Sequence, residues 1–485
     1  MIRPLLLLAA LALGWMGPAA TQLRAEEPPN ILFVFADDQS FSTIAALGNS
    51  EIETPNLDRL ARRGTVFSHS FNMGSWSGAV CVASRTMLNS GRSVWRANEI
   101  YRAADRERAE GRWWSELMKQ AGYRTYMTGK WHVPAKADLS FDVVADVRGG
   151  MPKQTEAGYG HPAEDPRERW SPSDPRYGGY WEGGTHWSEV VGNHATDFLA
   201  DASKRDEPFF MYIAFNAPHD PRQSPQAYVD RYPAEKITVP ASFQSLYPFK
   251  DAIGCGESLR DERLAPFPRT PHDVQIHRQE YYAIITHMDA QIGRILDALE
   301  DSGKADNTWI FFTADHGLAC GEHGLMGKQN LYDHSVRVPF VVVGPGVPSG
   351  ATIETPVYLQ DVMPTTLELA GLDKPDHVEF HSLLPLLAGE THSLYPAIYG
   401  AYLDLQRSIR TERYKLIVYP KAERVRLYDL QDDPQELRDL AEQESSKPLI
   451  QTLYRQLKAL QKELGDDLEL DFVANTDAFG LPLND

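Results

Sequence analysis

The sequence is poor in cysteine, with three in 485 residues. So few thiols exclude a small fold held by disulfide bonds and a zinc site with four cysteine ligands. Positive charge is also in deficit, because 48 Lys and Arg face 67 Asp and Glu and give a formal net charge of −19. Since general nucleic-acid binding needs a basic surface, we expect no nucleic-acid partner. An anionic small substrate is still compatible with this balance, because local charge can oppose net charge.

Long apolar runs are absent beyond the N-terminus. Arg3 precedes an apolar run, residues 5–13, that is too short to span a bilayer. Small residues and then a polar stretch follow, which is typical of a signal peptide over residues 1–25; an uncleaved anchor is the alternative. We therefore expect export to the periplasm or the extracellular space, with no stable membrane insertion after cleavage. Export permits disulfide formation, so pairing of Cys255 with Cys320 is left open.

Short apolar runs predict buried strands at residues 31–36, 123–128, 209–215, 309–313 and 339–343. Helical patterns separate them, and the clearest has apolar residues at steps of four and three between Tyr281 and Leu299. This alternation predicts an α/β fold with a large mixed, mostly parallel sheet flanked by helices. Residues 148–187, rich in Gly, Pro, Tyr and Trp, are expected to form a surface excursion that lines a site.

The pattern changes after about residue 372, which predicts a second, smaller domain. Residues 408–419 and 425–430 are typical of antiparallel strands joined by a turn at 420–423, and residues 447–464 of a helix. We assign residues 26–374 to a catalytic domain and residues 375–485 to a small α+β domain, with a tail from about 471.

Polar residues follow four of the predicted strands: Asp37 and Asp38, then residues 129–132, 216–220 and 315–317. Ligands bind beyond the carboxyl ends of strands in open α/β sheets, so these groups are expected to converge. Asp37, Asp38 and Asp315 together form a hard oxygen site suited to Ca²⁺ or Mg²⁺. Basic and proton-donating groups add what an oxyanion substrate needs: Lys130, His132, His219 and Lys328.

Cys81 is open to two interpretations on its own. A free cysteine is usually a small buried hydrophobe. Near Arg85 and a predicted helix start, it could instead be a thiolate nucleophile.

Several motifs in order carry a specific resemblance. Residues 81–92 (CVASRTMLNSGR) resemble the sulfatase signature C-x-P/A-S-R followed by Leu and T/S-G-R, and residues 121–132 (AGYRTYMTGKWH) resemble the second signature. Asp37-Asp38, Pro218-His219, the T-x-D-H-G at 313–317 and Gly327-Lys328 match further blocks. The chain is thus similar to the type I formylglycine-dependent sulfatases of the alkaline-phosphatase-like superfamily. Ala83 stands where Pro is commoner, which leaves the maturation enzyme open.

The resemblance implies that a maturation enzyme oxidises Cys81 to Cα-formylglycine. Its hydrate would attack the sulfur of a sulfate ester and then release sulfate. One Ca²⁺ would be held by Asp37, Asp38, Asp315 and His316, with residue 81 completing the shell; many family members have Asn in place of His316. The remaining positions take these implied roles: Arg85 orients the nucleophile, Lys130 and Lys328 bind sulfate oxygens, His132 helps to deprotonate the hydrate, and His219 protonates the leaving alkoxide, with Lys328 as a second candidate for that proton.

The expected substrate is a sulfated carbohydrate, because the predicted export and long polar loops favour one. The candidate sugar contacts are Trp131, Asp220 and Arg222, and Trp76, Trp95 and Gln223 are weaker candidates. A formylglycine-dependent phosphodiesterase or phosphonate monoester hydrolase is the nearest alternative. A non-catalytic glycan-binding homologue and a protein with an unmodified Cys81 are the others.

Overall fold

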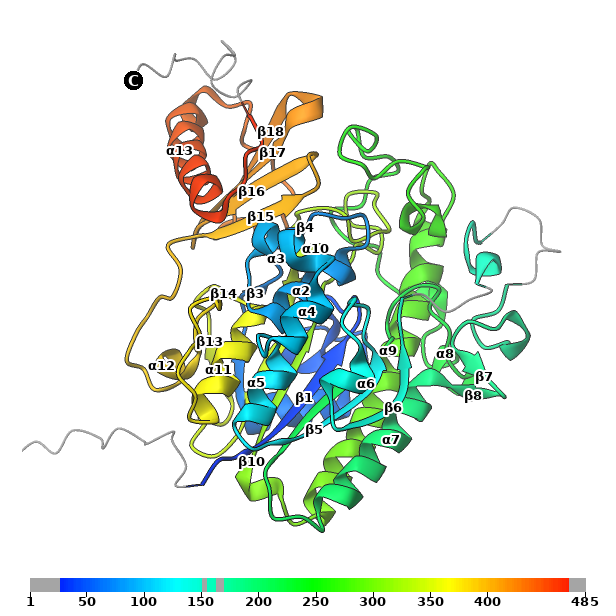
Figure 1. The fold of residues 1–485 in the computed structure, drawn as a ribbon. Coiled ribbons are helices and arrows are strands. Elements are labelled where there is room, and N and C mark those ends of the chain that lie inside the picture. The colour runs from blue at the N-terminus through cyan, green and yellow to red at the C-terminus, as the bar shows by residue number, and fades with distance from the viewer. Residues whose placement is uncertain (1–26, 151–154, 163–169, 471–485) are drawn as a thin grey trace, which may run out of the picture.

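The computed structural model describes residues 27–150, 155–162 and 170–470 (Figure 1). The predicted signal peptide and the tail from residue 471 lie outside the described residues.

The large sheet has eight strands in the order β13-β2-β12-β10-β1-β9-β5-β6. Neighbours are parallel except β12, which is antiparallel to both β10 and β2. This confirms the mixed, mostly parallel sheet, and all five predicted strands lie in it. The strands are β1 (Asn30–Ala36), β2 (Thr65–Phe67), β5 (Arg124–Lys130), β6 (Val143–Arg148), β9 (Phe209–Ala214), β10 (Thr308–Ala314), β12 (Phe340–Val343) and β13 (Ala351–Ile353).

Helices cover both faces of this sheet, as Figure 1 shows. Trp114 of α5 packs on Phe33 and Tyr212, which the strand register places side by side on one face. Tyr126 pairs in register with the residue of β9 that precedes Tyr212, so its side chain lies on the opposite face of the sheet. There it packs on Phe198 of α7. One layer contains α1 (Pro55–Arg63), α7 (Trp187–Ala202) and α9 (Pro271–Asp301), and the other contains α2 (Val80–Ser90), α5 (Trp114–Gln120) and α11 (Val362–Leu369).

Helix α9 shows why the sequence pattern predicted a helix between 281 and 299. Thr270 and Asp273 form a capping box at its start, and Pro271 occupies its first turn. The predicted apolar face, from Tyr281 to Leu299, is buried.

The small domain is an antiparallel sheet with one helix beside it. Its strands are β15 (Ile398–Tyr402), β16 (Gln406–Arg410), β17 (Tyr414–Tyr419) and β18 (Arg424–Asp429), and its helix is α13 (Lys447–Leu464). The prediction of one strand over 408–419 was wrong: Thr411 N donates to Tyr414 O at 2.8 Å, and this turn divides the segment into β16 and β17. Strand β4 (Gly74–Ser75), from the N-terminal half, pairs in parallel with β15 as the edge strand of this sheet.

Shorter elements connect these layers. They are α3 (Val94–Tyr101), α4 (Ala104–Ala109), α6 (Ala137–Ser140), α8 (Gln226–Val229), α10 (Asp333–Val336), α12 (Leu384–Leu387), β3 (Ser70–Phe71), β7 (Trp181–Glu182), β8 (Thr185–His186), β11 (Arg337–Val338) and β14 (Val357–Tyr358).

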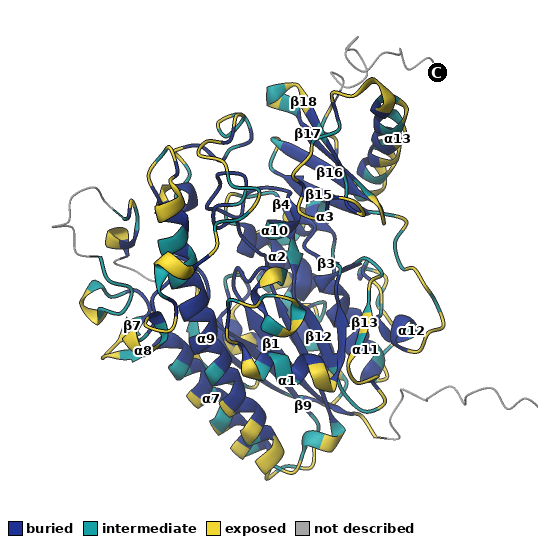
Figure 2. Cartoon of the chain, turned by 180° about the vertical axis from the view of Figure 1, so that it is seen from behind, coloured by how far each residue is buried: buried dark blue, intermediate teal, exposed yellow. Residues whose placement is uncertain are grey.

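Buried residues extend from the large sheet into the small domain, as Figure 2 shows. Met73 and Met87 of the large domain share one apolar cluster with Ile409 and Leu416 of the small one. Cys255 and Cys320 are buried free thiols, so the disulfide that the sequence left open is not formed. None of the helices in the described part of the chain combines the length and apolarity needed to cross a bilayer.

Candidate active site

Three carboxylates form the centre of the site at the carboxyl ends of β1 and β10. Ligand oxygens of Asp37, Asp38 and Asp315 lie within 4.8 Å of one another, and all three residues are buried. Asp38 has a left-handed backbone with φ of 69°, and its N–H donates to Asp315 Oδ1 at 3.0 Å. A non-glycine residue in this region is uncommon and often marks a functional site.

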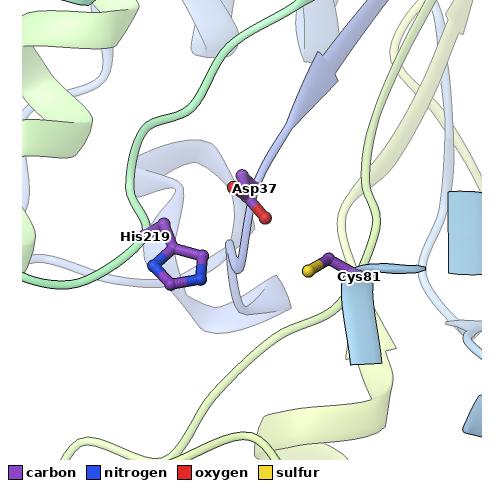
Figure 3. Close-up of side chains that lie close together, drawn as sticks. All are labelled: Asp37, Cys81 and His219. Atoms are coloured by element: carbon purple, nitrogen blue, oxygen red, sulfur yellow. The ribbon is translucent and has the colours of Figure 1, made fainter. Parts of the chain in front are cut away.

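Cys81 approaches this cluster from the first turn of α2. Figure 3 shows its sulfur and the ring of His219 directed toward the space beside Asp37; one ligand atom from each lies within 4.8 Å of the others. Arg85, one turn further along α2, donates Nε to Asp315 Oδ2 at 2.9 Å and Nη1 to Lys130 O at 2.7 Å. The helix thus carries Cys81 and a fixed cation, Arg85, on one face.

The end of β5 supplies the next two side chains. A Cβ on Gly129 (φ of 94°) would lie 1.8 Å from Ala214 O, so only glycine fits where β5 crowds β9. Lys130 Nζ then reaches Asp37 Oδ2. His132 has φ of 56° and places Nδ1 3.2 Å from Cys81 Sγ.

His219 and Lys328 close the site opposite Cys81. His219 lies in the loop after β9, with Nε2 3.0 Å from Lys328 Nζ and 3.5 Å from Asp38 Oδ2. Lys328 Nζ contacts Asp38 Oδ2 at 2.5 Å. The site therefore holds two lysines and one arginine against three carboxylates.

The electrostatics separate the roles of these groups. Burial alone raises the pKa of Asp315, but Arg85, Lys130 and Lys328 hold it well below the usual range. Burial, followed by the charges of Lys130 and Arg85, lowers the pKa of His132 to about 3, so its imidazole is neutral. Burial and Lys328 also lower the pKa of His219.

His316 does not join the carboxylate cluster. Its Nδ1 lies 2.7 Å from its neighbour's carbonyl oxygen, Gly317 O, and it belongs to no group of close ligand atoms found among the described residues. Burial lowers its pKa to about 4, so the ring is neutral. A contact between His316 and a cation therefore stays a prediction.

Two predicted sugar contacts lie in the interior instead. Trp131 is 4% exposed, packs on Phe141 and Tyr212, and donates Nε1 to a backbone carbonyl. Arg222 is 1% exposed, lies 5.1 Å from the Tyr281 ring centroid and contacts Cys320. Both side chains pack against neighbouring elements in this structure, and a sugar contact by either one stays a prediction.

Asp220 is also buried, at 2% exposure, but beside the site. Its Oδ1 lies 3.0 Å from His219 Nδ1, and its Oδ2 accepts a hydrogen bond from Tyr159. With both oxygens engaged, Asp220 contacts the proposed acid rather than an open sugar site.

The sequence prediction missed several residues that support the site. Tyr180 donates its hydroxyl to the carbonyls of Asn216 and His219 at 2.9 and 2.8 Å. Gln329 donates to Asp261 at 2.7 Å and to Gly78 O at 3.1 Å, which links the Lys328 loop to the start of α2. Tyr159 and Tyr180 come from the 148–187 segment, and its Tyr-rich composition was the feature of the sequence that could have pointed to them. Nothing in the sequence distinguishes Gln329.

Carboxylates and several cations at one edge of an α/β sheet are suited to the hydrolysis of an anionic ester. The family model described as Sulfatase matches residues 29–372, and one described as N-sulphoglucosamine sulphohydrolase, C-terminal, matches residues 321–463. The chain therefore belongs to the sulfatase family, the sulfuric ester hydrolases.

Individual relatives of the chain are also named as sulfatases. An arylsulfatase of Clostridium perfringens is 29% identical over 481 residues, covering 90% of this chain and 94% of the relative. An N-acetylglucosamine-6-O-sulfatase of Bacteroides thetaiotaomicron is 25% identical over 542 residues, covering 95% and 91%.

Solved structures show the same fold at lower identity. One, solved in complex with its substrate D-glucosamine-2-N,6-O-disulfate, has a TM-score of 0.71 at 23% identity and covers 91% of this chain and 99% of its own. The phosphonate monoester hydrolase of Agrobacterium radiobacter has a TM-score of 0.69 at 22% identity, covering 90% and 96%. These likenesses confirm the predicted alkaline-phosphatase-like architecture.

Proposed function

We propose that this sulfatase removes sulfate from a sulfated carbohydrate, using residue 81 matured from cysteine to formylglycine. The observation that carries the proposal is the convergence of Cys81 with three carboxylates, two lysines and two histidines at one sheet edge. When present, the hydrated formylglycine supplies the oxygen that attacks sulfur. The products are inorganic sulfate and the free alcohol.

The carboxylate cluster fits one Ca²⁺. Within the described residues, Asp37 Oδ1 and Asp38 Oδ1 are buried and receive no hydrogen bond. Buried carboxylate oxygens without a donor are costly, and a hard divalent cation is the partner they favour. Asp37, Asp38 and Asp315 would hold the ion, which would supply positive charge for the sulfate oxygens.

The chain's own residues then divide the chemistry. Lys130 and Lys328 are buried ammonium groups whose pKa values the neighbouring carboxylates raise against the effect of burial, so they stay charged and can bind sulfate oxygens. Arg85 fixes the orientation of residue 81 and Asp315. Neutral His132, beside residue 81, accepts a proton during sulfate release, and His219 donates one to the leaving oxygen.

A carbohydrate substrate is supported by relatives rather than by a contact in this chain. The Bacteroides relative is named for an N-acetylglucosamine 6-O-sulfate, and one structural neighbour was solved with a sulfated glucosamine. The predicted signal peptide fits a protein that meets such glycans outside the cytoplasm.

A formylglycine-dependent phosphonate or phosphodiester hydrolase is the second candidate. The specific observation is the fold match to a phosphonate monoester hydrolase. Lys130, His132 and Lys328 favour sulfate, because they occupy space where a two-metal phosphatase would place its second ion.

The test compares wild-type protein, expressed with a maturation enzyme, with Cys81→Ala on an aryl sulfate, an aryl phosphonate and a panel of sulfated oligosaccharides. We expect sulfate release by the wild type alone, and a residue-81 peptide whose mass shows sulfur replaced by oxygen. Equal turnover by Cys81→Ala would reject the nucleophile. Preference for the phosphonate would favour the second candidate, and binding without turnover by matured protein would favour a non-catalytic glycan-binding role.

A further inference from the structure

The loop that carries His219 contains a buried carboxylate that the reaction outlined above does not use. His219 Nε2 faces Lys328 Nζ at 3.0 Å. An ammonium group only donates hydrogen bonds, so Nε2 accepts and the ring proton of neutral His219 lies on Nδ1. That Nδ1–H meets Asp220 Oδ1 at 3.0 Å and the Asp220 backbone carbonyl at 2.9 Å.

Asp220 is itself held from two sides. Tyr159, from the 148–187 segment, donates its hydroxyl to Asp220 Oδ2. Arg260 places Nη2 3.8 Å from Asp220 Oδ1. Tyr180 holds the carbonyls of Asn216 and His219, so the loop backbone is fixed as well. Side chain and backbone of the His219–Asp220 pair are thus both constrained.

We infer that Asp220 is the positioning residue for His219: its carboxylate accepts the Nδ1 proton and turns Nε2 toward the oxygen of the departing alcohol. The inference deepens the proposed function and rests on its assignment of His219 as proton donor. For this step Nε2 takes a proton from the Lys328 ammonium group that faces it. As the S–O bond breaks, its electron pair stays on the leaving oxygen, which takes that Nε2 proton and leaves Lys328 neutral, while the Nδ1–H stays bonded to Asp220. An imidazole can otherwise flip and exchange nitrogen for carbon at both positions.

The experiment uses the dependence of rate on the leaving group. The matured, full-length enzyme is assayed on para-nitrophenyl sulfate, whose phenolate leaves without protonation, and on phenyl sulfate, whose phenolate benefits from it. Asp220→Ala should lower kcat on phenyl sulfate by roughly 10- to 100-fold, part of the 10²–10⁴-fold that a general acid contributes. Its kcat on the nitrophenyl ester should change by less than about threefold.

Three further variants make the result specific. In a His219→Ala background, Asp220→Ala should lower kcat on phenyl sulfate no further, because the two residues act as one unit. Tyr159→Phe keeps the carboxylate and removes one hydroxyl, so it should show a smaller loss with the same leaving-group bias. Glu280→Ala is the matched control: Glu280 Oε2 lies 3.0 Å from His161 Nε2 in a second buried carboxylate–histidine pair. It should show no leaving-group bias.

A readout independent of turnover is the histidine tautomer. In ¹⁵N-histidine-labelled protein, His219 should show a protonated Nδ1 in the wild type and lose that preference in Asp220→Ala. Equal losses on both esters with an unchanged tautomer would overturn the role of Asp220 while leaving the proposed function intact. If His219→Ala itself lacked leaving-group bias, the proton-donor assignment would fail, and the role of Asp220 with it.

Discussion

Two buried ionic clusters of similar composition have different arrangements. The catalytic cluster contains Asp37, Asp38, Asp315, Arg85, Lys130 and Lys328. The junction cluster, where the small domain meets the large one, contains Asp333, Glu436, Lys415 and Arg410. In the junction cluster, Lys415 Nζ lies between the carboxylates, 2.7 Å from Asp333 and 2.8 Å from Glu436. In the catalytic cluster the carboxylates face one another, and the cations contact them from outside.

This difference separates a structural ion network from a cation site. In the junction cluster a cation lies between the two carboxylates, whereas each catalytic carboxylate has its cation on the outer side and its oxygens face those of the other two. Like-charged carboxylates within 4.8 Å of one another are costly unless a cation lies between them. The count of charges is therefore a poor guide to a metal site, and the placement of carboxylate oxygens is a good one.

The same substitution in each cluster should give opposite outcomes. Asp315→Asn removes a charge that holds Arg85 and the proposed cation, so kcat/KM on an aryl sulfate should fall by roughly 10²–10³-fold. Asp333→Asn breaks a buried pair and should cost about 3–5 kcal/mol in free energy of unfolding, with activity per folded molecule unchanged. Urea unfolding and kinetics on the same samples test both; a purely thermodynamic effect of Asp315→Asn would remove the contrast.

Lysine substitutions probe the cations in the same way. Lys328→Met should lower kcat by roughly 10²-fold, since a preorganised positive charge at the sulfate is lost. Lys415→Met leaves two junction carboxylates without their shared partner, so it should lower stability and leave kcat unchanged. Aryl sulfate kinetics with thermal unfolding would decide, and a normal kcat for Lys328→Met would contradict its place in the site.

Calcium should distinguish the clusters by stability alone. Ca²⁺ added to chelator-treated wild type should stabilise it by about 2.7 kcal/mol at roughly 100 times Kd. Asp333→Asn should respond in parallel from a lower starting Tm, whereas Asp315→Asn should show little response. If all three proteins responded equally, the cation would bind elsewhere.

Sequence reasoning found what is local and periodic. The apolar runs predicted β1, β5, β9, β10 and β12, and the strand-end rule brought Asp37, Lys130, His219 and Asp315 to one edge. It did not predict tertiary packing: Trp131 and Arg222 stand beside proposed catalytic residues, and neighbouring elements bury both side chains. Tyr159 reaches the site from the 148–187 segment, whose composition indicated a surface excursion that lines a site, but no local pattern reveals which of its residues makes the contact.

Asp361, a buried carboxylate that forms no ion pair with the residues that the structure describes, extends the comparison to pH. Cations hold the pKa values of Asp315 and Asp333 below the usual range despite burial. Asp361 accepts hydrogen bonds from Tyr395 and from the N–H groups of Tyr358 and His381, and burial raises its pKa to about 7.

The sign of the pH effect follows from that raised value. The native state binds this proton more tightly than the unfolded chain, whose Asp pKa is about 3.9. Its stabilising contribution is complete below about pH 4 and is lost as pH rises through about 7. Relative to Asp361→Asn, the wild-type free energy of unfolding should therefore fall with pH over this window, by at most about 1.4 kcal/mol per unit. The measurement is urea unfolding of both proteins at several pH values. If the two free energies of unfolding varied with pH in parallel, Asp361 would be ionised in the native state, and burial would not control its protonation.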